Sequence, residues 1–158
     1  MSSKIQRYQS LDPLLTGLMQ DSPHDLSRYS NFVALLYQNF PIYSWIGFYF
    51  LHNNHLILGP FQGRVACDTI ALGRGVCGTV IKSGHPHIAQ DVRLLDNYIA
   101  CDHYTLSEIV LPLTYQGTAI GVLDIDSYVI RAFDEEDRIG LEKLLTILTN
   151  SLNGHLPL

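Results

Sequence analysis

Apolar residues near both ends of the chain recur at steps of three and four, the spacing of helices with one buried face. Ser10 and Pro13 predict the start of a first helix, because proline fits the first turn. Asp25 is placed to cap a second helix, and Asp134 with Asp137 forms a box-like start of a last one. The expected buried positions are Leu26, Tyr29, Phe32, Val33, Leu36 and Phe40 in the second helix, and Ile139, Leu141, Leu144, Leu145, Ile147 and Leu148 in the last.

The middle of the chain has the aromatic and β-branched composition of strands. Asn53-Asn54 and Tyr115-Gln116-Gly117 predict tight turns between pairs of strands. Residues 75–82 predict a short helix that ends at Ser83-Gly84. Residues 90–105 lack a clear period, and a loop of that length in a compact domain is usually functional. The expected strands are residues 45–51, 55–59, 64–72, 108–113 and 118–126.

The order of these elements predicts an α+β fold. Connections that look like hairpins predict a central antiparallel sheet, with the helices packed on one face and loops covering a pocket on the other. Because no linker or repeat divides the sequence, we expect residues 1–158 to form one domain. Within it, helices occupy residues 1–42, the sheet and pocket loops residues 43–133, and the last helix residues 134–152.

Composition narrows the classes of function. The 158 residues are 47% hydrophobic and 16% charged, as in a compact globular protein. The net charge of -5 provides no basic surface to neutralise phosphates, so we expect no nucleic-acid partner. No apolar stretch approaches the ~18 residues of a membrane span, and the N-terminus does not look like a signal peptide. We therefore expect no membrane contact and a cytoplasmic location.

Three cysteines, Cys67, Cys77 and Cys101, are the only ones in the chain. Each is followed by the turn-former Asp or Gly, and none lies in a long apolar run. Their spacing contains no C-x-x-C pair for a structural zinc, and an odd number argues against a static disulfide framework. In a reducing compartment this pattern favours thiol chemistry, in which one cysteine attacks and another resolves.

Motifs spread from Trp45 to Leu141 resemble those of GAF domains, and more closely those of the free methionine-(R)-sulfoxide reductases built on that fold. The motifs are WIGFYF, LGPFQGRVAC, LGRGVCG, IACD, SEIVLPL, GVLDIDS and FDEED. The general GAF pattern is degenerate, whereas the cysteines in these contexts are specific. The resemblance implies an oxidoreductase that reduces the sulfoxide of free L-methionine, R epimer at sulfur. It also implies thioredoxin as the external electron donor and no cofactor.

The resemblance implies a role for each cysteine. Cys101 would attack the sulfoxide, Cys67 would resolve it, and Cys77 would be an accessory thiol or an alternative partner. The chemistry fits, because the attacking thiolate becomes a sulfenic acid that a second thiol converts to a disulfide. An external dithiol then restores the enzyme.

Three carboxyls and two aromatic residues are candidates for the rest of the site. Asp124 and Asp126 share one face of a strand, and with Glu108 they could titrate as a coupled set. A protonated member would donate a proton to the departing oxygen, and an ionised member would bind the substrate ammonium. The resemblance favours Glu108 and Asp126 as the pair closest to the sulfoxide, with Asp124 beside them. Trp45 and Tyr49 share a strand face and would pack against the substrate methyl and sulfur.

Other site chemistries have weaker support. Residues 73–78 match G-x-G-x-x-G, but a dinucleotide site needs a long helix and a parallel crossover, so a tight turn into a short helix is favoured. The N–H groups of this turn, or of the loop before Cys101, are candidates for binding the substrate carboxylate. His85 and His87, with His103 and Cys101, are metal-ligand types without a supporting pattern around them, so we expect no metal.

Two other functions could use the same residues. A GAF-type module could bind a small molecule, such as a nucleotide or tetrapyrrole, without turnover and without oxidising thiols. A peroxide-sensing switch should react with peroxide faster than with methionine sulfoxide, and should not discriminate the epimers. The open face and the two N-terminal helices are compatible with a homodimer.

Overall fold

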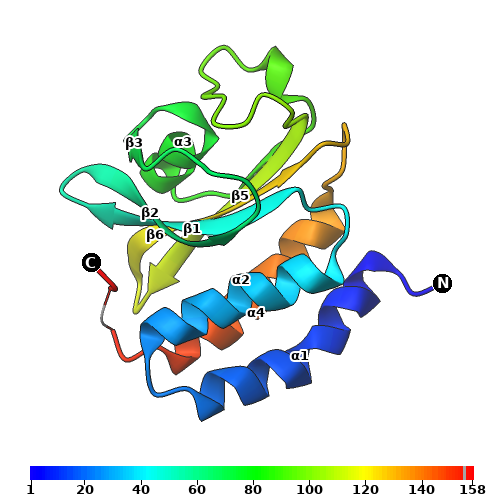
Figure 1. Cartoon of the computed structure of the whole chain (residues 1–158), viewed down its shortest axis with the longest axis vertical. Helices are drawn as coiled ribbons and strands as arrows, with labels where there is room; N and C mark the ends of the chain where they lie inside the picture. Colours follow the sequence, from blue (N-terminus) through cyan, green and yellow to red (C-terminus); the bar gives the residue numbers. More distant parts are fainter. Residues whose placement is uncertain (155) are drawn as a thin grey trace.

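The computed structural model describes residues 1–154 and 156–158, and its central element is a six-stranded antiparallel sheet (Figure 1). This confirms the expected α+β class. Helices α2 (Asp25–Asn39) and α4 (Glu135–Ser151) cover one face of the sheet, α1 (Lys4–Asp21) packs on the outside of these two helices, and α3 (Gly75–Ser83) lies on the other face. The strands, in the order β3-β2-β1-β6-β5-β4, are β1 (Trp45–His52), β2 (His55–Gln62), β3 (Thr69–Ala71), β4 (His87–Ala89), β5 (Ser107–Tyr115) and β6 (Thr118–Ser127).

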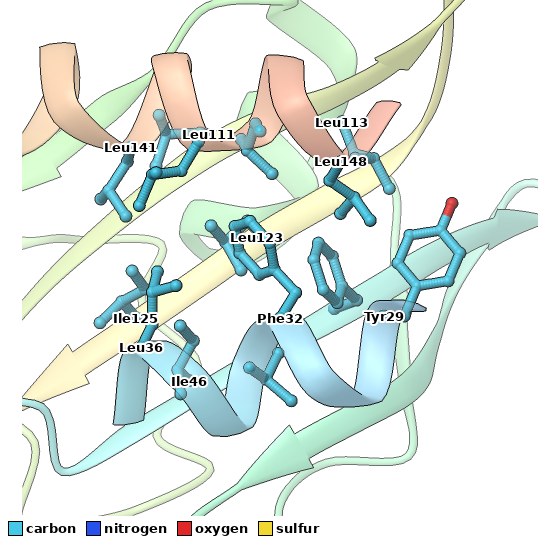
Figure 2. Close-up of a cluster of buried hydrophobic side chains, with 14 of the residues drawn as sticks. Tyr29, Phe32, Leu36, Ile46, Leu111, Leu113, Leu123, Ile125, Leu141 and Leu148 are labelled. Carbon is cyan, nitrogen blue, oxygen red and sulfur yellow. The ribbon is translucent and has the colours of Figure 1, made fainter. Parts of the chain in front are cut away.

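Side chains of the central strands point alternately into two cores, one on each face of the sheet. On one face, apolar strand residues pack against α2 and α4 (Figure 2). Phe32 of α2 and Leu141 of α4 are fully buried there, and each such side chain contributes about 1.5–3 kcal/mol of burial energy. The strand residues of this core are Ile46, Phe48 and Phe50 from β1, Ile109, Leu111 and Leu113 from β5, and Leu123 and Ile125 from β6.

The opposite face is covered by α3 as well as by loops. Val76, Val80 and Ile81 of α3 pack against Val110 of β5 and Val122 of β6. The prediction that helices cover only one face is therefore wrong. A helix of nine residues can be buried here because most of its side chains are apolar. This helix forms one wall of the pocket.

Helix α1 begins earlier than predicted. Ser3 and Gln6 form a capping box, so the helix starts at Lys4 and continues through Pro13. Pro13 is exposed, while Leu11 and Leu15 on either side of it are buried. Packing of that buried face against α4 therefore keeps the helix continuous across the proline.

A buried polar network joins α1 to α4. The Tyr8 hydroxyl donates to Asp137 Oδ1 at 2.8 Å and bonds the Tyr43 hydroxyl at 2.5 Å. Lys4 Nζ lies 2.6 Å from Asp137 Oδ2. The predicted box of Asp134 and Asp137 is confirmed as a capping box. The Asp137 carboxylate therefore both accepts from the Asp134 N–H at the start of α4 and binds Tyr8 and Lys4 of α1.

Three other local predictions are corrected. Asp25 is the first residue of α2 rather than its cap, and its buried carboxylate pairs with Arg28 at 2.8 Å. Leu26 and Ile139 are exposed, because they lie beside the buried stripes of α2 and α4. Of the strand expected over residues 64–72, only β3 forms. None of the helices in the described residues has both the length and the apolar character to cross a membrane.

Candidate active site

The predicted polar site residues meet in one row across the pocket face of the sheet. Trp45 of β1 lies opposite Asp126 of β6. Asp126 in turn lies opposite Glu108 of β5. Asp124 is two residues from Asp126 on the same strand and therefore points to the same face. Positions far apart in sequence are thus neighbours through strand register alone.

A small cavity, partly open to solvent, lies over this row. Residues from the row, from the first turn of α3 and from the loop before β5 line it. Cys67 lies at its edge and is bonded to Cys101. The structure therefore brings together all eight residues predicted for the site. Those that line the cavity are Trp45, Tyr49, Cys77, Cys101, Glu108, Asp124 and Asp126.

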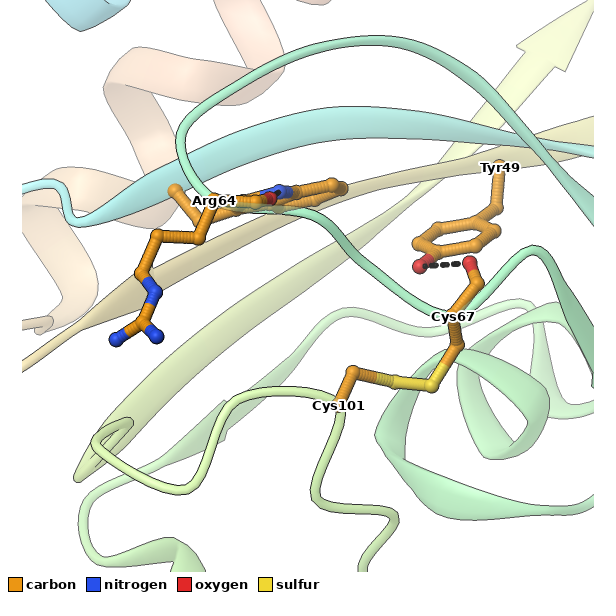
Figure 3. Close-up of a disulfide and its surroundings, with 5 residues drawn as sticks. Tyr49, Arg64, Cys67 and Cys101 are labelled. Carbon is orange, nitrogen blue, oxygen red and sulfur yellow. Dashed lines mark hydrogen bonds between the residues drawn. A yellow bond between two sulfur atoms is a disulfide. The ribbon is translucent and has the colours of Figure 1, made fainter.

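Cys67 and Cys101 form a disulfide that joins two loops, with their Cα atoms 5.4 Å apart (Figure 3). Cys67 follows β2, and Cys101 lies in the long loop before β5. Cys77 is free and buried in the first turn of α3. A helix start can lower a thiol pKa, but burial and the nearby Asp124 and Glu108 carboxyls raise the pKa of Cys77 well above its usual value.

Two of the three carboxyls are almost fully buried, and Asp126 is partly buried. Glu108 is 5% exposed and Asp124 is 7% exposed. Burial, followed by the charges of Asp124 and Asp126, raises the pKa of Glu108 well above its usual value. Burial likewise raises the pKa of Asp126, and it raises the pKa of Asp124 to about 6. Burial therefore favours the protonated form of Glu108 and Asp126, whereas Asp124, with the smaller shift, is the member most easily ionised.

The cluster is suited to a ligand that carries a cation. Asp124 Oδ1 is buried and has no hydrogen-bond partner among the described residues. Arg74, the basic residue lining the cavity, is exposed. Cys77, Glu108 and Asp124 place one potential metal-ligand atom each within 4.8 Å of one another, whereas His85 and His87 belong to no such group in the described residues.

The aromatic wall has the predicted arrangement. The Trp45 and Tyr49 rings stack with centroids 6.0 Å apart, and Phe61 of β2 stacks on Trp45 at 5.5 Å. Gly47, between the two on β1, leaves room for the indole. A Cβ at Gly47 would lie 2.3 Å from Trp45 Cη2 and 2.6 Å from Phe61 Cβ.

We expect Gly47→Ala to destabilise the protein by about 1–3 kcal/mol, because the added methyl group forces Trp45 from its place. Urea unfolding measures the stability, and the emission of Trp45, the single tryptophan, reports the displaced indole. Gly17→Ala is the control. Gly17 lies inside α1 with nothing within 4 Å of its Cβ position, so alanine there should stabilise by roughly 0.5–1 kcal/mol. Unchanged emission and stability in Gly47→Ala would contradict the assigned packing.

Sequence reasoning missed several residues that line the cavity. Tyr98 and Ile99 come from the long loop. The length of this loop predicts a functional role, but the sequence does not show which of its residues line the cavity. Ile99 packs over Gly75, where a Cβ would lie 3.3 Å from its side chain. The loop is also tied to the glycine turn by Asn97, whose amide donates to the Gly73 carbonyl at 2.7 Å. Both glycines have positive φ, which confirms the tight turn.

Comparison with known proteins agrees with this arrangement. Residues 31–153 match the family profile of the GAF domain. The chain is 43% identical over 150 residues to the free methionine-R-sulfoxide reductase of Escherichia coli, covering 95% of this chain and 91% of that protein. It is 37% identical over 161 residues to the Saccharomyces cerevisiae protein of the same name, covering 95% and 89%.

A solved structure gives the same result in three dimensions. The X-ray structure of free methionine-R-sulfoxide reductase from Neisseria meningitidis, in complex with its substrate, superposes with a TM-score of 0.91 at 37% identity. The alignment covers 96% of this chain and 91% of that one. Fold and pocket thus define a GAF domain. Within that class, the chain belongs to the free methionine-R-sulfoxide reductase family.

Proposed function

We propose that the chain reduces free methionine (R)-sulfoxide to methionine in this cavity, with Cys101 as the attacking thiol. The observation that carries the proposal is that Cys101 lines a cavity beside three carboxyls whose pKa values are raised, and that it is bonded to a second cysteine. A thiol, an acid and a resolving thiol are the groups that sulfoxide reduction requires.

In the first step, the Cys101 thiolate attacks the sulfoxide sulfur while a carboxyl gives a proton to the oxygen. Glu108 and Asp126 are proposed for this acid role, because burial raises the pKa of both and so favours the protonated form. The oxygen passes to Cys101 as a sulfenic acid, and methionine leaves. Asp124, with its unpartnered oxygen, is proposed to bind the substrate ammonium. Trp45 and Tyr49 would contact the methyl group and sulfur.

In the second step, the Cys67 thiol displaces water from the sulfenic acid and forms the Cys67–Cys101 disulfide. Cys77 is buried and free while that disulfide is closed, which favours an accessory role for it. An external dithiol protein, proposed to be thioredoxin, then reduces the disulfide. The cycle needs no bound cofactor, and it fits a reducing compartment such as the cytoplasm. Assembly as a homodimer stays a prediction.

A single-turnover experiment tests this function. Reduced protein is mixed with free methionine-(R)-sulfoxide or, separately, with the S epimer, and both methionine and remaining thiols are counted. We expect methionine from the R epimer alone, with loss of about two thiols per methionine. Ligand binding with no methionine and unchanged thiols would favour a binding module, and faster reaction with peroxide would favour a redox switch.

A further inference from the structure

The segment that carries Cys67 is held by side chains instead of by strand pairing. Residues 64–67 follow β2 and, within the described residues, make no backbone–backbone hydrogen bonds. Two side chains of β1 hold the segment instead (Figure 3). Trp45 Nε1–H donates to the Arg64 carbonyl at 3.0 Å, and the Tyr49 hydroxyl donates to the Cys67 carbonyl at 2.9 Å.

The two donors are themselves fixed. Trp45 is 5% exposed and Tyr49 is 1% exposed, and both project from the centre of the sheet. Burial raises the pKa of Tyr49 far above its usual value, so its hydroxyl stays a hydrogen-bond donor. In contrast, Val65 between the two anchored carbonyls is 87% exposed and has little packing. The two hydrogen bonds therefore fix the backbone on the path from β2 to Cys67, alongside the contacts of the Arg64 side chain with Asp102 and Tyr104 and the packing of Ala66 and Cys67 against the pocket-side core.

This restraint matters for the resolving step. Cys67–SH reacts with Cys101–SOH, a sulfur–sulfur bond forms, the sulfur–oxygen bond breaks, and the oxygen leaves as water. The rate depends on how often the two sulfurs meet, which is an effective-concentration effect of holding both loops in place. The hydrogen bond from the Tyr49 hydroxyl is accepted by the carbonyl of Cys67 itself. The Cα atom of Cys67 lies 5.4 Å from that of Cys101.

We propose that Trp45 and Tyr49 are positioning residues for the resolving cysteine, in addition to lining the cavity. Their two hydrogen bonds hold residues 64–67 so that Cys67 closes on Cys101 as soon as the sulfenic acid forms. This inference rests on the proposed function, because it takes Cys101 as the residue that is oxidised. It predicts that the hydroxyl of Tyr49 affects the second step of the cycle more than the first.

Tyr49→Phe tests the proposal, because it keeps the ring in the cavity wall and removes the donor. Reduced protein is mixed with one equivalent of methionine-(R)-sulfoxide, and quenched samples are analysed for methionine, for disulfide and for dimedone-trapped sulfenic acid. We expect the rate of disulfide formation relative to that of methionine formation to fall about tenfold, with sulfenic acid accumulating. Trp45→Phe should lower the same ratio less, because the Trp45 indole donates to the carbonyl of Arg64, three residues before Cys67.

Tyr43→Phe is the matched control. It also removes a buried hydroxyl hydrogen bond, to Tyr8, but in the core on the helix side of the sheet. A general loss of stability would slow both steps or neither and leave the ratio unchanged in every variant. An unchanged ratio in Tyr49→Phe, or an equal fall in Tyr43→Phe, would overturn the proposal.

A second arm separates this inference from the proposed function. Hydrogen peroxide oxidises a reactive cysteine to the same sulfenic acid, so disulfide closure can be followed without methionine sulfoxide. If the wild-type protein forms no methionine, the proposed function fails. Slower closure after peroxide in Tyr49→Phe than in wild type would still support the positioning role, and equal closure would refute it.

Discussion

Cys101→Ser should abolish methionine formation, with a loss of more than about a thousandfold in the single-turnover rate, because a serine hydroxyl is a far weaker nucleophile than a thiolate. Cys67→Ser should differ in kind. It should release about one methionine per chain and then stall, with Cys101 left as a sulfenic acid that dimedone traps. Rapid-quench counting of methionine, together with mass spectrometry of the trapped protein, measures both results.

The two variants distinguish the roles of the cysteines. If Cys101→Ser kept its first turnover, another cysteine would be the nucleophile. If Cys67→Ser continued to turn over with an external dithiol, Cys77 could be the resolving thiol, although Cys77 is free beside the closed disulfide. Tryptic mapping of the disulfide in each variant would identify the pair. If Cys77→Ser still forms the Cys67–Cys101 disulfide, the accessory role of Cys77 is supported.

Much of the fold could be predicted from hydrophobic periodicity. The long strands and the last helix have enough residues for a pattern, and hairpin turns such as Asn53-Asn54 are encoded locally, with both residues at positive φ. The short edge strands β3 and β4 span three residues each, too few to show alternation. Pro13 predicts a first turn and therefore too late a start for α1, whereas packing on α4 keeps the helix intact across the proline.

The site was predictable in its residues but not in its geometry. Strand alternation places Asp124 and Asp126 on one face, and the register that sets Glu108 opposite Asp126 is a tertiary result. Spacing alone did not choose a cysteine pair, and the resemblance supplied Cys67 with Cys101. The sequence around Cys77, GVCG, does not decide between a packed and a reactive thiol, and the structure shows that Cys77 is buried. It is buried because it faces the sheet, where its sulfur lies within 4.8 Å of carboxylate oxygens of Glu108 and Asp124.

Glu108→Gln should slow the first chemical step by about 10²–10⁴-fold, the usual range for loss of a general acid. Glutamine has nearly the same shape and can still hydrogen-bond, so substrate affinity should change much less. Stopped-flow single turnovers over a range of substrate concentrations separate the two quantities. A rise in the apparent dissociation constant with an unchanged limiting rate would show that Glu108 only binds. Glu135→Gln, at an exposed carboxylate of α4, is the matched control.

The dependence on pH follows from the same raised pKa. Because the acid must be protonated, the wild-type rate of the first step should fall as pH rises through the raised pKa of the cluster, and Glu108→Gln should weaken this dependence to the part that Asp126 contributes. Stability should respond with the same sign. Between the ordinary glutamate pKa and the raised one, the unfolded chain loses its proton first, so stability falls as pH rises. Removing that carboxyl should therefore make the melting temperature of Glu108→Gln decline less steeply above neutral pH than that of the wild type.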